Sequence, residues 1–242
     1  MIDIHSHIIY GIDDGARTIE EAIQMIRMDS SFGVTDIIAT PHYYVSRPTD
    51  PDQIHYRLNN IEKTIAEMND KQPEEAVSVR LYPGNEVLWF ESMPEKLKSG
   101  AILTLAGTRY TLVEFYPDQN IETMLRAVRK LRYSGYIPVI AHAERYVALR
   151  ANDAVSELIR QGAQIQLSTG AFSGGFFDKE AKFVKKAVKD DLVHYLGTDM
   201  HRTDRRAPDW SAAIRYIRKT AKDPDALFFG NAAEILGKDL KS

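Results

Sequence analysis

The 242-residue sequence contains no cysteine, and this absence excludes three kinds of chemistry. Without cysteine the protein has no disulfide bonds, so its fold depends on a packed core. A thiolate nucleophile is excluded, and so is a structural zinc site with cysteine ligands. Any metal site in this chain must therefore be built from histidine, aspartate and glutamate.

Long apolar runs and a strong net charge are missing as well. No run is long enough to span a bilayer, and Asp3 and His5 interrupt the N-terminus where a signal peptide needs an apolar run, so we expect a cytoplasmic protein with no direct membrane insertion. The net charge of -3 gives no reason to expect nucleic-acid binding. Since no repeat or long linker divides the sequence, we expect one domain over residues 1–242.

Short apolar runs alternate with segments of helical spacing along the whole chain. The predicted strands cover residues 1–5, 35–40, 78–83, 110–116, 136–142, 163–168 and 192–198. The predicted helices cover residues 18–32, 54–68, 121–133, 153–161, 178–188 and 208–221, and Gly33, Gly135 and Gly162 are placed to end three of them. This alternation predicts a parallel sheet, either open and doubly wound or closed into a barrel.

Polar residues at the strand ends favour the barrel. Imidazole and carboxylate groups recur where the apolar runs end, at His5, His7, Asp13, Asp14, His42, Glu86, Glu114, His142, Glu144, Asp199 and His201. In a barrel the carboxyl ends of parallel strands converge on one face, whereas an open sheet spreads them along a line. We therefore predict a β/α barrel with these groups gathered in one pocket.

The gathered groups predict a metal centre. His5 and His7 are two residues apart in a strand, so both imidazoles can face the same side and bind one ion. Taken alone, this pattern also fits two structural histidines, and Asp13-Asp14-Gly15 also fits an ordinary turn. Mixed imidazole and carboxylate ligands suit Mn, Fe or Zn, and such ions lower the pKa of bound water and neutralise phosphoryl oxygens. The sequence therefore predicts metal-assisted hydrolysis of a phosphomonoester.

Six motifs carry a family resemblance: DIHSH at 3–7, DDG at 13–15, TPH at 40–42, GNE at 84–86, VIAHAERY at 139–146 and GTDMH at 197–201. With them the chain resembles the polymerase-and-histidinol-phosphatase (PHP) superfamily. Within it, the chain is similar to the protein tyrosine phosphatases encoded with capsular and exopolysaccharide genes of Gram-positive bacteria. The resemblance implies an α/β fold, a distorted (β/α)7 TIM-like barrel (the PHP fold), with three divalent metal ions, Mn being expected and Fe or Zn being alternatives.

The resemblance also implies a ligand set for each ion. The first ion would be held by His5, His7, Glu86 and Asp199, and the second by Glu86, Glu114 and His142. The third would be held by Asp14, His42 and His201, with Asp13 as the competitor of Asp14. Asp199 and His201 are expected to take part in catalysis together with two arginines, Arg145 and Arg206, which resemble the phosphate-binding arginines of the family.

Two groups of neighbouring residues leave alternatives open. Arg202 or Arg205 could bind phosphate in place of Arg206, since guanidinium groups match phosphate oxygens in pairs. Five aromatic residues could flank an incoming tyrosyl ring or could simply pack the loops: Tyr43, Tyr44, Tyr116, Tyr146 and Phe172.

The leading functional hypothesis is a Mn-dependent protein tyrosine phosphatase. By resemblance, its substrate and partner would be the phosphotyrosine-bearing tail of a bacterial tyrosine kinase that regulates capsular and exopolysaccharide biosynthesis. A small-molecule phosphomonoesterase such as a histidinol-phosphate phosphatase would share the metal site and is the first alternative. The second is a non-catalytic, metal-stabilised module that binds the kinase. The sequence predicts neither the general acid nor the oligomeric state.

Overall fold

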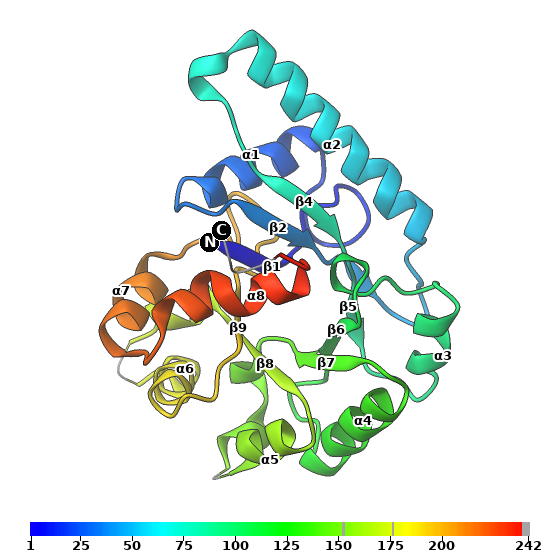
Figure 1. The fold of residues 1–242 in the computed structure, drawn as a ribbon, viewed down its shortest axis with the longest axis vertical. Helices are drawn as coiled ribbons and strands as arrows, with labels where there is room; N and C mark the ends of the chain where they lie inside the picture. Colours follow the sequence, from blue (N-terminus) through cyan, green and yellow to red (C-terminus); the bar gives the residue numbers. More distant parts are fainter. Residues whose placement is uncertain (152, 176, 239–242) are drawn as a thin grey trace.

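The computed structural model describes residues 1–151, 153–175 and 177–238. Their strands are β1 (Ile2–Ser6), β2 (Asp36–Ala39), β3 (His42–Tyr43), β4 (Arg80–Pro83), β5 (Glu86–Leu88), β6 (Tyr110–Glu114), β7 (Ile137–Ile140), β8 (Gln164–Ser168) and β9 (Tyr195–Gly197). All paired strands are parallel and form two sheets, in the orders β1-β2-β4 and β3-β5-β6-β7-β8-β9. Figure 1 shows that together they curl into a ring with most of the helices outside it.

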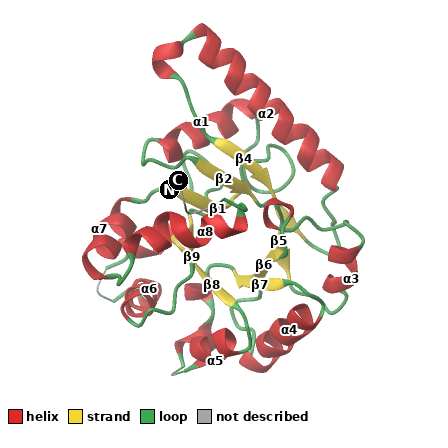
Figure 2. Cartoon of the chain, in the orientation of Figure 1, coloured by secondary structure: helices red, strands yellow, loops and turns green. Residues whose placement is uncertain are grey.

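The helices are α1 (Ile19–Ser30), α2 (Pro51–Lys71), α3 (Met93–Lys98), α4 (Ile121–Tyr133), α5 (Ala154–Arg160), α6 (Lys179–Lys189), α7 (Ser211–Thr220) and α8 (Asn231–Ile235). Figure 2 shows how they surround the strands. The six predicted helices are confirmed, and α3 and α8 are additions that are too short to give a periodic apolar pattern. None of the described helices is both long enough and apolar enough to cross a bilayer.

Two of the seven predicted strands, 35–40 and 78–83, are each followed after a short break by a second, shorter strand that was not predicted. Pro41 stands between β2 and β3, where it offers no N–H to a neighbouring strand. Asn85 stands between β4 and β5; its side chain donates to the carbonyl of Pro41 at 3.0 Å and accepts from the N–H of Leu103 at 2.9 Å. Asn85 therefore bridges both breaks. At these breaks the chain passes from the three-stranded sheet, which contains β2 and β4, into the six-stranded sheet, which contains β3 and β5.

The ring is closed between its first and last strands. The N–H of Asp199 donates to the carbonyl of His5 at 2.8 Å, and the N–H of His7 donates to the carbonyl of Met200 at 2.9 Å. A further parallel bridge joins Ser6 to Met200. The predicted distorted (β/α)7 TIM-like barrel is therefore confirmed, with β3 and β5 as continuations of two of its seven strands.

The barrel interior is apolar at its amino-terminal end and polar at its carboxyl-terminal end. Buried side chains from β1, β2, β6 and β7 form one cluster with α8, namely Ile2, Ile4, Ile38, Leu112, Val139, Ala232, Ala233 and Ile235 among others. Figure 1 shows α8 lying across the middle of the ring. A second, larger cluster fills the space between the strands and the outer helices. Since α8 covers one end, ligands must approach from the other.

Candidate metal centre

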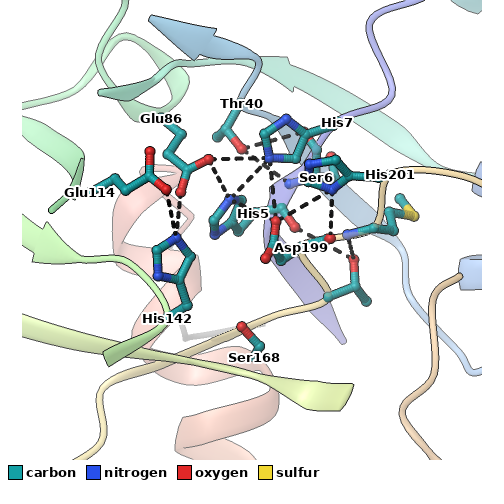
Figure 3. Close-up of polar contacts among 12 residues, drawn as sticks. His5, Ser6, His7, Thr40, Glu86, Glu114, His142, Ser168, Asp199 and His201 are labelled. Atoms are coloured by element: carbon teal, nitrogen blue, oxygen red, sulfur yellow. Dashed lines mark hydrogen bonds and ion pairs between the residues drawn. The ribbon is translucent and has the colours of Figure 1, made fainter. Parts of the chain in front are cut away.

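The predicted ligands converge at the carboxyl-terminal end of the barrel, and Figure 3 labels all of them except Asp14 and His42. His5 lies on β1, His42 on β3, Glu86 on β5 and Glu114 on β6. The other ligands lie in the segments that follow strands, namely His7, Asp14, His142, Asp199 and His201. Two glycines allow this convergence. A Cβ at Gly197 would lie 2.6 Å from the Cβ of His5, and a Cβ at Gly15 would lie 2.2 Å from the carbonyl oxygen of His7. Only glycine permits these close approaches.

The first predicted ligand set forms a compact group of four side chains. The Nε2 atoms of His5 and His7 are 3.3 Å apart, and each lies 3.3 Å from Oε2 of Glu86. Each is also 3.4 Å from Oδ1 of Asp199. All four side chains are buried, and one ligand atom from each lies within 4.8 Å of the others. This arrangement fits a single divalent ion with nitrogen and oxygen ligands.

The second predicted set shares Glu86 with the first. His142 Nε2 lies 2.7 Å from Oε1 of Glu86 and 3.6 Å from Oε1 of Glu114. The structure adds His42, whose Nδ1 is 3.0 Å from Oε2 of Glu86 and 3.8 Å from Oε2 of Glu114. The backbone of His142 is left-handed, with φ of 32°, which is uncommon for a residue with a Cβ and is a local strain found at functional sites.

The third predicted set joins the loop after β1 to the segment after β9. Oδ1 of Asp14 lies 3.5 Å from Nε2 of His42 and 3.4 Å from Nε2 of His201, and His7 completes the group. Asp13 instead contacts the back of two ligands, since it lies 2.7 Å from Nδ1 of His7 and accepts from the N–H of His42 at 3.0 Å. The geometry therefore favours Asp14 over Asp13 as the ligand, with Asp13 orienting the imidazole of His7 and holding the backbone of His42.

The polar atoms of the centre are incompletely paired with one another. Nδ1 of His42 and Oε2 of Glu86 are buried and lie 3.0 Å apart, but neither makes a hydrogen bond of good geometry with any described residue. Burial alone would raise the pKa of Glu86, but the imidazoles of His5, His142 and His42 outweigh it and hold that pKa well below its usual value. Glu86 is thus ionised and open to a cation. The donor set and these orphaned atoms fit divalent metal ions.

Glu114 and His142 show how strongly burial acts on this face. Burial, together with the charge of Glu86, raises the pKa of Glu114 to about 7. Burial, together with Arg145, lowers the pKa of His142 to about 4, so its imidazole is neutral near pH 7. A neutral imidazole is the form that binds metal, and protons compete with metal at Glu114.

Two arginines lie beside the ligand groups. Arg145 and Arg206 both form ion pairs with Oδ2 of Asp199, the oxygen opposite the one that faces His5 and His7. Arg206 Nη1 also lies 3.0 Å from Nε2 of His201. Arg202 and Arg205 line a small cavity with Arg206, but no contact joins either to Asp199 among the described residues. The geometry therefore favours Arg145 and Arg206 as the phosphate-binding pair.

Two positioning residues were not predicted from the sequence. Oε1 of Gln166, inside the barrel on β8, lies 3.2 Å from Nδ1 of His5 and accepts from the N–H of His142 at 2.7 Å. Asp3 faces the helices and accepts from the N–H groups of His5 at 3.1 Å and Thr198 at 3.0 Å. The sequence feature that could have identified Gln166 is its position as a polar residue in the middle of the strand sequence AQIQLS.

The five candidate aromatic residues separate into two groups by burial. Tyr43, Tyr146 and Phe172 are buried and belong to the core. Tyr44 is half-buried, with its ring stacked on that of His42 at a centroid distance of 5.1 Å, and Tyr116 is exposed. Of these five, only Tyr44 and Tyr116 are accessible enough to meet a substrate ring, and only Tyr44 contacts a candidate ligand.

Comparison with known proteins points to one family. The family model for capsular polysaccharide synthesis proteins CpsB/CapC matches residues 1–237. The chain is 33% identical over 244 residues to tyrosine-protein phosphatase CpsB of Streptococcus agalactiae serotype V, with 98% of each protein covered. It is 30% identical over 224 residues to tyrosine-protein phosphatase YwqE of Bacillus subtilis strain 168, covering 90% of this chain and 84% of the relative.

Solved structures agree with the sequence comparison. One, from work on YwqE of Bacillus subtilis and CpsB of Streptococcus pneumoniae that describes them as unique metal-dependent tyrosine phosphatases, has a TM-score of 0.87 at 27% identity. It covers 99% of this chain and 96% of its own. Histidinol phosphate phosphatase of Lactococcus lactis, solved with zinc, L-histidinol and phosphate, has a TM-score of 0.53 at 15% identity, which shows a shared fold.

Proposed function

Because the chain belongs to the CpsB/CapC capsular polysaccharide synthesis family, we propose that it is a metal-dependent protein tyrosine phosphatase that acts without a cysteine nucleophile. The observation that carries the proposal is the convergence of three overlapping groups of ligand atoms on one face of the barrel. The naming of relatives of similar length as tyrosine-protein phosphatases supports the reaction class.

We propose that three ions bind in the three ligand sets. The first would be held by His5, His7, Glu86 and Asp199, the second by Glu86, Glu114 and His142, and the third by Asp14, His42 and His201. When bound, divalent ions supply a water nucleophile ionised near neutral pH and neutralise charge on phosphoryl oxygens. We further propose Mn as the metal, with Fe and Zn as alternatives of similar ligand preference.

The chain itself binds and orients the phosphate ester. Arg145 and Arg206 are held side by side by Asp199, and their remaining N–H groups can bind phosphoryl oxygens in pairs. Tyr44 and Tyr116 can contact the aromatic ring of the substrate. Phenolate is a good leaving group, because the pKa of its conjugate acid is about 10, so the reaction depends less on a strong general acid.

The biological substrate we propose is the phosphotyrosine tail of a bacterial tyrosine kinase, with a role in regulating capsular or exopolysaccharide biosynthesis in the cytoplasm. Support for this finer statement comes from the family description, which concerns capsular polysaccharide synthesis. A histidinol-phosphate phosphatase and a kinase-binding module without turnover are the competing functions, and the experiment below separates all three.

The test is hydrolysis by purified protein with and without chelator. We expect hydrolysis of p-nitrophenyl phosphate and phosphotyrosine peptides, loss of activity with chelator, recovery with Mn, and about three metal ions per chain by elemental analysis. His142→Ala should lower kcat/KM by at least about a hundredfold, because it removes a ligand. The matched control is His55→Ala, which changes an exposed histidine on α2.

Three results would contradict the proposal. Full activity after complete metal removal would exclude the metal mechanism. A higher kcat/KM for histidinol phosphate than for phosphotyrosine peptides would favour the small-molecule phosphatase. Tight binding of a kinase tail by the wild type and His142→Ala alike, without turnover by either, would favour the binding module.

A further inference from the structure

A cavity of about 470 Å³ opens beside the third ligand group and is not used by the chemistry described above. Asp14 and His42 form one side of it, and Tyr44, Arg47 and Arg57 stand on the others. Its volume lies within the range of ligand-binding clefts in proteins. Because two metal-ligand residues line it, a substrate bound at the metal centre has direct access to this cavity.

The wall of the cavity is a folded turn rather than a loose loop. The N–H of Arg47 donates to the carbonyl of Tyr44 at 3.0 Å, and the hydroxyl of Thr49 donates to the carbonyl of His42 at 2.5 Å. Asp50 then caps α2 by accepting from the N–H of Asp52 at 3.0 Å. These bonds fix the path of the backbone that carries Arg47 relative to His42.

The cationic side chains of the cavity lack carboxylate partners. In the described parts of the chain, no carboxylate lies within ion-pair distance of Arg47 or Arg57. Arg57 is anchored by the carbonyl and the ring of Tyr10, whose centroid is 4.9 Å from its guanidinium carbon. Arg47 is exposed. Three carboxylates also line the cavity, and each has another partner: Asp13 pairs with His7, Asp14 faces His42 and His201, and Asp50 caps α2.

Tyr44 lies between the metal centre and the cavity. Its ring lines the cavity and stacks on His42 at an interplanar angle of 27°. A phosphotyrosyl ring entering the metal centre would pass this ring, and the next residue of an extended peptide would follow about 3.3 Å further along. The neighbours of the phosphotyrosine therefore come within reach of Arg47.

We propose that this cavity, which we name the Arg47 pocket, binds an acidic side chain adjacent to the phosphotyrosine of the substrate. The inference rests on the proposed tyrosine phosphatase function and adds a sequence preference to it. Arg47 supplies the charge, and Arg57 adds a second, anchored cation. A carboxylate is the complementary group, since it accepts hydrogen bonds from a guanidinium in pairs.

The experiment compares three phosphotyrosine peptides that differ only in having Glu, Gln or Lys on both sides of the phosphotyrosine. For the Mn-loaded wild type we expect kcat/KM to be about tenfold higher for the Glu peptide than for the Lys peptide, and the preference to weaken at high ionic strength. Arg47→Glu should invert the order of the peptides. Arg109→Glu, an exposed arginine that precedes β6 at the opposite end of the barrel, should keep the wild-type order.

The possible outcomes separate this inference from the function on which it rests. Equal kcat/KM for the three peptides, or an Arg47→Glu variant with the wild-type order, would overturn the Arg47 pocket and leave the phosphatase function standing. Failure of the wild type to hydrolyse any of the peptides or p-nitrophenyl phosphate with Mn would overturn both. Inversion by Arg47→Glu together with an unchanged Arg109→Glu would support the pocket.

Discussion

Two buried carboxylates lie at opposite ends of the barrel and differ in how they are paired. Asp36, at the amino-terminal end, is fully buried, and both of its oxygens are paired. Glu86, at the carboxyl-terminal end, is equally buried, but one of its oxygens has no hydrogen-bond partner among the described residues. Arg80 donates to Asp36 at 2.9 and 3.2 Å, Thr35 donates at 2.8 Å, and Lys238 forms an ion pair. Around Glu86 the neighbours are the imidazoles of the candidate metal centre.

The difference separates a structural network from a functional one. A buried carboxylate costs free energy unless charges and hydrogen bonds compensate it. Asp36 receives that compensation from the chain itself, so its network is complete without a ligand. Glu86 receives it only in part, and a cation would complete it. We therefore expect changes near Glu86 to alter metal binding and changes near Asp36 to alter stability.

The largest expected effect tests the functional end. Asp13→Asn should weaken Mn binding by about ten- to a hundredfold, because Asp13 orients the imidazole of His7 and accepts from the backbone of His42, and such outer contacts tune metal affinity. Activity titrated against Mn should show the shift, with excess Mn restoring turnover. The control is Asp70→Asn, an exposed residue on α2. Unchanged Mn affinity would mean that Asp13 does not set the position of His7.

The structural end should respond in the opposite way. Asp36→Asn should lower the free energy of unfolding by about 2 kcal/mol and leave kcat/KM of the folded protein unchanged, because Arg80 and Lys238 lose their charged partner far from the metal centre. Thermal unfolding and Mn-saturated kinetics measure both effects. A variant that keeps its stability but loses activity would break the comparison between the two ends.

The wild type and the Asp36→Asn variant should also differ in how their stability depends on pH. Burial alone would raise the pKa of Asp36, but the hydrogen bonds from Arg80 and Lys238 lower it below the usual value. Asp36 therefore stabilises the fold above the unfolded pKa of about 3.9, and this contribution is lost as the pH falls through the folded pKa. Wild type and Asp36→Asn should approach equal stability in strongly acidic solution.

Most of the barrel could be predicted because it depends on local patterns. Apolar runs located all seven principal strands, and Gly33, Gly135 and Gly162 end helices with φ near 90° as glycine allows. The grouping of the candidate ligands could be predicted because parallel strands bring their carboxyl ends together, whichever strand each residue comes from. The short strands β3 and β5 could not be predicted, since the Asn85 side chain that joins their starting points contacts residues distant in sequence.

The side chain of Asp3 points to the other side of β1 from the one that strand alternation predicts. Alternation places Asp3, His5 and His7 on one side of β1. In the structure the register with β2 shifts by one residue between Asp3 and Ser6, so Asp3 pairs with Ile37 on the helix side while the histidines face the interior. Such a bulge depends on the partner strand, and one strand's own sequence does not reveal it. The role of Gln166 was also missed because it depends on other parts of the chain: its partners are His5 on β1 and His142 after β7.

The smallest expected effect concerns a third kind of buried carboxyl, which has neither the cations of Asp36 nor the imidazoles of Glu86. Asp29 on α1 is fully buried, accepts from Nε1 of Trp210 at 2.7 Å, and leaves its other oxygen without a hydrogen-bond partner among the described residues. Burial, together with the neighbouring Asp3, raises the pKa of Asp29 well above its usual value, against the opposing effects of the Trp210 hydrogen bond and the terminal amino group of Met1. The folded protein therefore retains a proton here that the unfolded chain releases.

The sign of the resulting pH dependence follows from that retained proton. Stability falls as the pH rises from the unfolded pKa of about 3.9 toward the folded pKa, and Asp29→Asn removes the dependence because an amide does not ionise. The variant should gain about 1 kcal/mol over the wild type at neutral pH, or about 2–4 °C in Tm, and less near pH ~5. Melting curves across this range, with Asp70→Asn as the control, measure the difference. A gap that does not change with pH would mean that Asp29 is ionised in the fold, and that a buried carboxylate in this protein needs neither a cation nor a proton.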